Sequence, residues 1–184
     1  MGTKFSQVYN RFLGKITDDM YMELTPLDTI RDLRNLIIDA IPGFEFPRVD
    51  LYSYNIDIKT KSSDDFDEED FVLSIDDTGV ALIDNSSFDC ELSSEEINIL
   101  AILMMISWVQ RQVTSIENTR MKYSGSDFKF TSQANHLSKL LSLLSETQKQ
   151  SLHMQRLYKR RRFDKEGKYE SNWSVLGATS ALDN

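Results

Sequence analysis

The stretch SSEEINILAILMMISWV, residues 93–109, decides the fold class of this chain. Ser93 and Glu96 have the spacing of a capping box, in which each side chain accepts a hydrogen bond from the other residue's backbone N–H. Residues 100–109 are apolar nearly all round, so the pattern predicts a central, buried helix that continues to about Met121. These ten residues are fewer than the roughly 20 that span a bilayer, and we expect no membrane association.

Two shorter helices are predicted upstream of this central helix. The first covers residues 5–13, where apolar side chains form one stripe, and Gly14 ends it. The second has Thr25 as its N-cap and Pro26 in its first turn, and Pro42-Gly43 ends it. Its predicted buried face consists of Ile30, Leu33, Ile37 and Ile41.

A long helix is predicted downstream, because no Gly or Pro occurs from Thr131 or Ser132 until Gly167. It ends in the cations of residues 159–162, which favour the negative end of the helix dipole. Its predicted apolar side consists of Leu137, Leu140, Leu141, Leu144, Leu152 and Leu157.

The period changes to two between residues 50 and 90. Residues 51–58 alternate as a half-buried strand does, and residues 71–75 and 80–83 flank a turn, as in a β-hairpin. We therefore predict a mainly α fold, an antiparallel helical bundle with a β-hairpin insertion and an extended C-terminal tail. Residues 1–162 form the single helical domain of this prediction, and residues 163–184 form the tail.

Charge is distributed unevenly along the 184 residues, whose formal net charge is −8. Residues 1–100 contain 22 acidic and 8 basic side chains, a net charge of −14, and residues 101–184 contain 7 acidic and 13 basic side chains, a net charge of +6. A generally basic nucleic-acid-binding protein is therefore not expected. Much of the negative charge lies in a predicted acidic loop, Asp64, Asp65, Asp67, Glu68, Glu69 and Asp70.

The sequence offers little that could perform catalysis. Cys90 is the only cysteine, and His136 and His153 lie 17 residues apart on one predicted helix. The acidic loop has alternate carboxylates, but Asp70 stands where a calcium loop requires glycine. No phosphate-binding, zinc-protease or serine-hydrolase motif occurs. We therefore expect no enzyme, no catalytic residue, no cofactor and no bound metal.

Two blocks resemble a known family, FSQVYNRFLGKITDD at residues 5–19 and FTSQANHL at residues 130–137, with LSSEEINILA at residues 92–101 between them. Together they resemble the head–tail connector (adaptor, or neck) proteins of tailed bacteriophages, over about residues 3–162. The resemblance implies a virion protein of the phage neck, assembled in the bacterial host cytoplasm. It implies a homo-oligomeric, dodecameric ring beneath the portal protein, in contact with a stopper-type tail or neck protein, with DNA passing through it without specific binding.

The resemblance gives two groups of residues a hypothetical role. The group expected to dock on the portal consists of Arg160, Arg161, Arg162, Trp173, Val175 and Leu176. The acidic loop is expected to face DNA or a neighbouring copy. Two alternatives stay open, another phage neck or tail-completion protein, and a small DNA-binding regulator that uses the basic helix end at residues 156–162.

Overall fold

The computed structural model of the chain describes residues 2–16, 24–62, 71–75, 80–122, 130–163 and 169–170. Within these ranges the helices are α1 (Phe5–Leu13), α3 (Pro26–Ala40), the 3-10 helix η1 (Ile41–Gly43), α4 (Ser94–Lys122) and α5 (Phe130–Arg160). The strands are β1 (Tyr54–Asn55), β2 (Ile58–Ser62), β3 (Phe71–Ile75), β4 (Val80–Asp84), β5 (Ser87–Phe88), β6 (Arg162–Phe163) and β7 (Tyr169–Glu170). The fold is mainly helical, as predicted.

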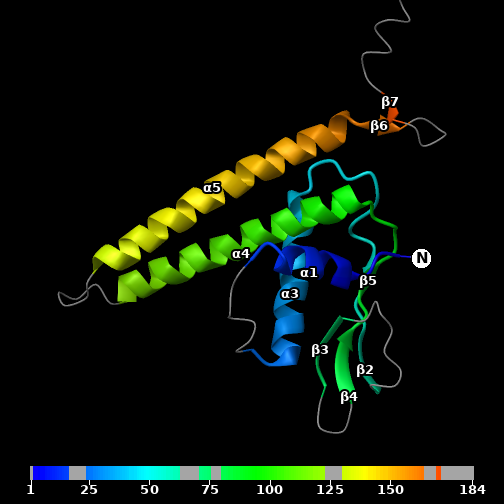
Figure 1. The fold of residues 1–184 in the computed structure, drawn as a ribbon, viewed down its shortest axis with the longest axis horizontal. Helices are drawn as coiled ribbons and strands as arrows, with labels where there is room; N and C mark the ends of the chain where they lie inside the picture. The colour runs from blue at the N-terminus through cyan, green and yellow to red at the C-terminus, as the bar shows by residue number, and fades with distance from the viewer. Residues whose placement is uncertain are drawn as a thin grey trace, which may run out of the picture.

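Helix α4 is the centre of the fold, because α1, α3 and α5 all pack against it. Figure 1 shows α4 and α5 side by side as a long hairpin, with α1, α3 and the strands β2, β3, β4 and β5 on the other side of α4, and β6 and β7 beyond the end of α5. The capping box predicted at its start is present: Ser93 Oγ accepts from the Glu96 N–H at 3.3 Å, and Glu96 Oε2 accepts from the Ser93 N–H at 2.8 Å. Residues 99–104 are buried, residues 105–108 are only partly buried, and Val109 and Val113 are buried again.

By length and composition alone, α4 is apolar enough to cross a membrane. Within Ser94–Asn118, an 18-residue window has a mean hydropathy of 1.4, and 44% of that window is buried inside the protein. The central helix of a globular core meets the same criterion, and the contacts of α4 with α1, α3 and α5 are those of such a helix.

Both upstream helices form as predicted. In α1, the side chains of Phe5, Val8, Tyr9 and Phe12 are fully buried. In α3, Thr25 Oγ1 accepts a hydrogen bond from the Asp28 N–H at 3.2 Å, and the predicted face from Ile30 to Ile41 is buried. The Tyr9 hydroxyl donates to Asp84 Oδ2 at 3.0 Å, which connects α1 to the end of β4. Burial, with the nearby Asp84 carboxylate, raises the pKa of Tyr9.

The hairpin predicted at residues 71–83 is confirmed, because β3 and β4 pair in antiparallel register. β2 adds to the other edge of β4, which gives the sheet order β2-β4-β3. The single strand predicted at residues 51–58 is wrong. The Tyr52 N–H donates to Asp50 Oδ1 at 2.9 Å, a local turn that diverts the chain before the separate short strands β1 and β2.

The apolar side predicted for α5 is wrong in part. Leu141, Leu152 and Leu157 are 45%, 41% and 37% exposed. The buried positions of the helix include polar residues instead, Thr147, Ser151 and Gln155. The reason is that their polar groups find partners: Thr147 Oγ1 donates to the Leu143 carbonyl at 2.7 Å, and Gln155 bonds groups outside the helix.

Candidate interaction site

The C-terminal end of α5 packs against the start of α4 and against the segment that follows η1. We call this region the α5-end cluster, and it consists of Arg48, Glu95, Glu96, Gln155, Tyr158 and Arg161. Its centre is the buried pair Glu96 and Tyr158. The Tyr158 hydroxyl donates to Glu96 Oε1, and Ser93 donates to Glu96 Oε2 through both its N–H and its hydroxyl. Burial and this carboxylate raise the pKa of Tyr158.

Arg48 caps the end of α5. Its Nη2 donates to the carbonyl oxygen of Tyr158 at 2.8 Å and also to that of Arg161. Its guanidinium carbon lies 4.2 Å from the centre of the Tyr158 ring. The last carbonyls of a helix have no partner within the helix, so a cation at this place satisfies them and favours the helix dipole.

Gln155 connects α5 to the segment after η1. Its Nε2 donates to the Gly43 carbonyl at 3.1 Å, and its Oε1 accepts from the Glu45 N–H at 2.8 Å. The amide thus satisfies two backbone groups of a segment that is 110 and more residues away in the sequence. Together with Arg48, this fixes where the basic end of α5 lies.

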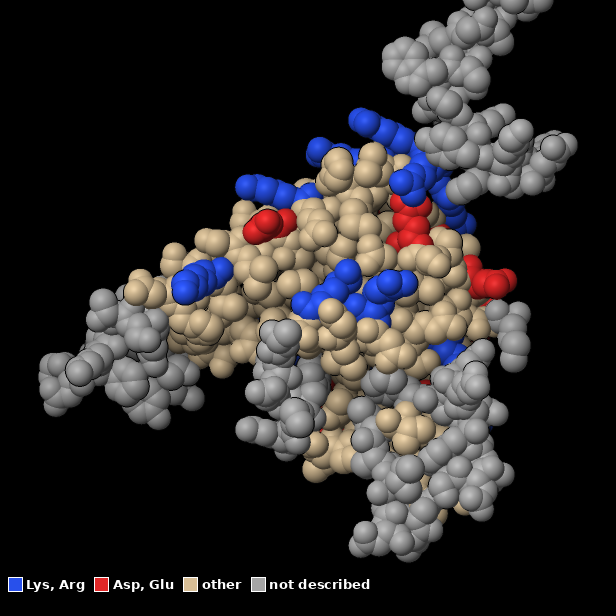
Figure 2. Space-filling view, in the orientation of Figure 1, with Lys and Arg blue, Asp and Glu red and all other residues tan. Residues whose placement is uncertain are grey.

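The predicted basic cluster includes cations that make contacts within the fold, although the side chains at residues 156 and 159–161 are all exposed. Arg161 Nη1 forms an ion pair with Glu95 Oε1 at 2.8 Å, and Lys159 Nζ lies 3.8 Å from the centre of the Phe46 ring. Arg156 and Arg160 are exposed. Lys and Arg side chains gather along α5 and over α1 in Figure 2. The basic end of α5 therefore serves both to hold the fold and to present positive charge.

A groove of about 420 Å³ lies beside this cluster and is lined by residues of α1, α4 and α5: Arg11, Ser94, Glu95, Asn98, Met154, Leu157 and Arg161. The partly exposed Leu157 and the half-buried Met154 give it an apolar wall. Arg11 lies on α1, and Lys15, of like charge, follows the end of this helix. Partial burial, and then the charge of Arg11, lowers the pKa of Lys15.

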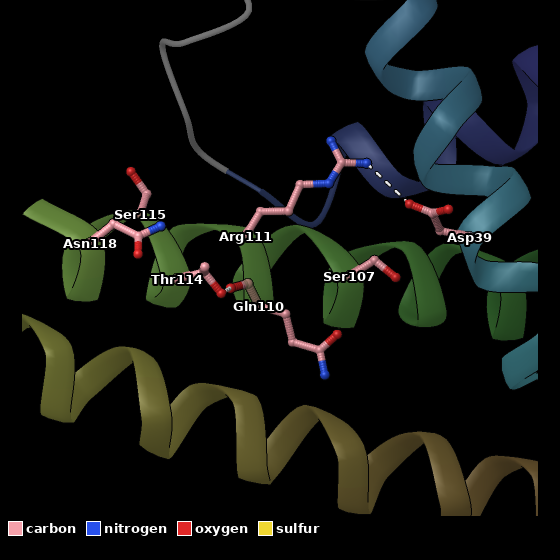
Figure 3. Close-up of a pocket in the computed structure, with 7 residues that line it drawn as sticks. All are labelled: Asp39, Ser107, Gln110, Arg111, Thr114, Ser115 and Asn118. Atoms are coloured by element: carbon pink, nitrogen blue, oxygen red, sulfur yellow. Dashed lines mark hydrogen bonds and ion pairs between the residues drawn. The ribbon is translucent and has the colours of Figure 1, made fainter.

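A larger hollow of about 830 Å³ lies on α4 and is lined only by polar residues, Asp39, Ser107, Gln110, Arg111, Thr114, Ser115 and Asn118 (Figure 3). Arg111 points toward α3, where it pairs with Asp39 at 3.4 Å and with Asp32 at 2.5 Å. Because two carboxylates already neutralise this cation, the hollow is poorly suited to bind a small anion.

The cysteine and the two histidines that were considered as catalytic candidates do not come together in one site. Cys90 is partly buried, its Sγ lies 3.5 Å from the Asp50 carbonyl oxygen, and burial raises the pKa of its thiol, which disfavours the reactive thiolate. His136 and His153 are both exposed on α5. Among the residues that the structure describes, no group of three or more His, Cys, Asp or Glu side chains could hold a metal ion.

Several of the predicted site residues lie outside the described residues. These are the acidic loop at residues 64–70 and the tail residues Trp173, Val175 and Leu176. Arg162 belongs to β6 through its backbone. Sequence reasoning missed Arg48, Gln155 and Tyr158, whose roles depend on contacts with residues distant in the sequence.

Comparisons with protein-family models, with curated proteins and with solved structures find no match to this chain.

Proposed function

We propose that the protein is a head–tail connector of a tailed bacteriophage, an adaptor that forms a ring beneath the portal, joins the capsid to the tail and lets DNA pass. The blocks at residues 5–19 and 130–137 carry the resemblance to this family. The observation that carries the proposal is the long α4–α5 hairpin, which exposes Leu141, Leu152 and Leu157. A protein that works through contacts with other chains exposes apolar side chains in this way.

The ends of the molecule would meet different partners. The tail that follows α5 would dock on the portal through Arg160, Arg161 and Arg162 and through Trp173, Val175 and Leu176. Arg160 supports this assignment because it is exposed, whereas Arg161 pairs with Glu95. The β-insertion would meet the stopper-type neck protein, and its acidic segment at residues 64–70 would face DNA or a neighbouring copy.

The assembled state would be a dodecameric ring in the neck of the virion, put together in the host cytoplasm. Each copy would be an antiparallel helical bundle with an extended C-terminal tail, and the helical cores of successive copies would pack side by side in the ring. DNA would pass through without specific binding and without catalysis, cofactor or metal. The family resemblance implies these features. The exposed α4–α5 hairpin supports one of them, the contacts between copies in the ring.

A DNA-binding regulator is the second candidate, favoured by the exposed Arg156 and Arg160 at the end of one helix. Its affinity for DNA would fall steeply with salt, because phosphate contacts release counterions. A connector requires no affinity for free DNA. Measurement of duplex binding at two salt concentrations separates these candidates. Another phage neck or tail-completion protein would share the helical core and differ in its partner.

The proposal is tested by mixing the purified chain with a portal ring and measuring mass by light scattering after size exclusion. We expect co-elution as a defined assembly, and no binding to the portal would contradict the proposed function. Arg160→Glu should weaken the complex about 10-fold, because it reverses one charge at the docking end. Arg31→Glu on α3 makes the same change in charge at a side chain that is 57% exposed, and it should leave binding unchanged.

A further inference from the structure

The outer part of the α4–α5 hairpin, residues 107–118 and 136–149, is here called the hairpin arm. Its fully buried core consists of only Val109, Val113 and Leu137. Half-buried apolar side chains surround these three, Met105, Trp108, Ile116, Leu140, Leu143 and Leu144. Because this apolar cluster comes from α4 and α5 alone, part of its surface stays in water, so a further layer would stabilise the arm.

On α5, the side of the arm that faces away from α4 carries a shallow groove of about 590 Å³, lined by Ser138, Leu141, Ser142, Ser145, Glu146 and Lys149. Leu141 and Leu152 are the exposed leucines on this flank, three turns apart. The serines between them are small enough to let another helix approach closely. We call this surface the α5 outer face.

On α4, the hollow of about 830 Å³ in Figure 3 lies on the opposite side of the arm. Val109 faces α5, and Ser107, two residues earlier, points about 200° away from it around the helix. Ser107, Thr114 and Asn118 therefore line the side of α4 that is turned away from α5. The half-buried Ile106 is one turn from Gln110 and offers apolar surface at the edge of the hollow.

The two surfaces carry opposite charge. Around the α5 outer face, three exposed cations stand against one exposed carboxylate: Lys139, Lys149 and Arg156 against Glu146. At the α4 hollow, two carboxylates stand against one cation: Asp32 and Asp39 against Arg111. Two surfaces of opposite sign attract each other, whereas two copies of the α5 outer face would repel.

We infer that a second copy of this chain lays its α5 outer face into the α4 hollow of the first. This inference rests on the ring of the proposed function and names the surfaces that would form it. Because the two surfaces differ and lie on opposite sides of the arm, each contact leaves one of each kind open to a further copy. Such a head-to-tail contact closes into a ring when the rotation between copies allows it.

The contact is tested by disulfide cross-linking in a Cys90→Ser background, which removes the only natural cysteine. Thr114→Cys is placed in the α4 hollow and Ser142→Cys on the α5 outer face, at two exposed positions. The chain with both changes is oxidised alone and bound to a portal ring, and is then run on a non-reducing gel. A chain that combines Thr114→Cys with Tyr52→Cys, whose position is 68% exposed and lies outside the arm, is the matched control.

We expect a ladder of covalent oligomers from the doubly changed chain, dimers only from a mixture of the two single variants, and monomers from the control. Dimers from Ser142→Cys alone would show an α5–α5 contact and overturn the inference. Monomers from the doubly changed chain, both with and without portal, would also overturn it. If that chain still co-elutes with the portal, the connector role stands and only the assigned surfaces are wrong.

Discussion

The two halves of the α4–α5 hairpin are built differently. At the inner half, α4 packs against α1, α3 and α5, and a large cluster of side chains around Leu100 is fully buried. At the outer half, the apolar core comes from α4 and α5 and shrinks to Val109, Val113 and Leu137, and α3 reaches α4 through the ion pairs of Asp32 and Asp39 with Arg111. The same pair of helices is therefore deeply buried at one end and more exposed at the other.

Truncation of a leucine in each half should show the largest difference. Leu100→Ala, at a side chain with no exposed area, should lower the free energy of unfolding by about 3 kcal/mol, because it removes buried methyl groups and leaves a cavity. Leu144→Ala makes the same chemical change at a half-buried site of the hairpin arm and should cost about 1 kcal/mol. Urea denaturation measures both, and equal losses would contradict the difference between the halves.

The inner half also depends on polar contacts. Tyr158→Phe removes the hydroxyl that donates to the buried Glu96 carboxylate and should cost about 2 kcal/mol. The control is Tyr52→Phe, at a side chain that is 68% exposed, and it should leave the urea midpoint where it is. If both variants unfold at the same urea concentration, the Glu96–Tyr158 pair contributes nothing to the inner half.

Alkaline pH should also destabilise the inner half selectively. Burial raises the pKa of both Tyr158 and Tyr9 in the folded protein, whereas the ordinary value is 10.0. Above pH 10 the unfolded chain loses these protons first, so the stability that is present below pH 10 falls as the pH rises. Urea titrations at a series of pH values should show this fall, and Tyr158→Phe should make it shallower. A stability that stays constant above pH 10 would contradict the burial of both hydroxyls.

Local signals in the sequence predicted the elements that depend on local contacts. The capping box of α4, the N-cap at Thr25 and the β3–β4 hairpin each lie within a few residues of the pattern that predicts them. The orientation of α5 could not be predicted in this way. The buried Gln155 of α5 bonds to Gly43, 112 residues away, and leucine periodicity carries no information about such a partner.

The same distinction between local patterns and long-range contacts applies to the candidate site. The basic residues at the end of α5 were recognisable as a run of charge, but the sequence does not show that Arg161 pairs with Glu95, 66 residues away, or that Arg48 caps the helix. Long-range ion pairs and caps arise from the packing of whole helices, so they become visible only when the helices are placed. The exposure of Leu141, Leu152 and Leu157 on α5 was not predicted for the same reason.

Trp108 lies where the two halves of the hairpin meet. Of the substitutions considered, one at this residue should change the free energy of unfolding the least. Its side chain packs against both clusters, and its indole N–H is buried without a hydrogen-bond partner in the part of the chain that the structure describes. Trp108→Phe removes this unsatisfied donor but also some apolar contact, and these contributions oppose each other. We expect the free energy of unfolding to change by less than about 1 kcal/mol. A loss as large as that of Leu100→Ala in the same urea titration would mean that the indole N–H has a partner, and that the inner half extends farther along α4 than its burial indicates.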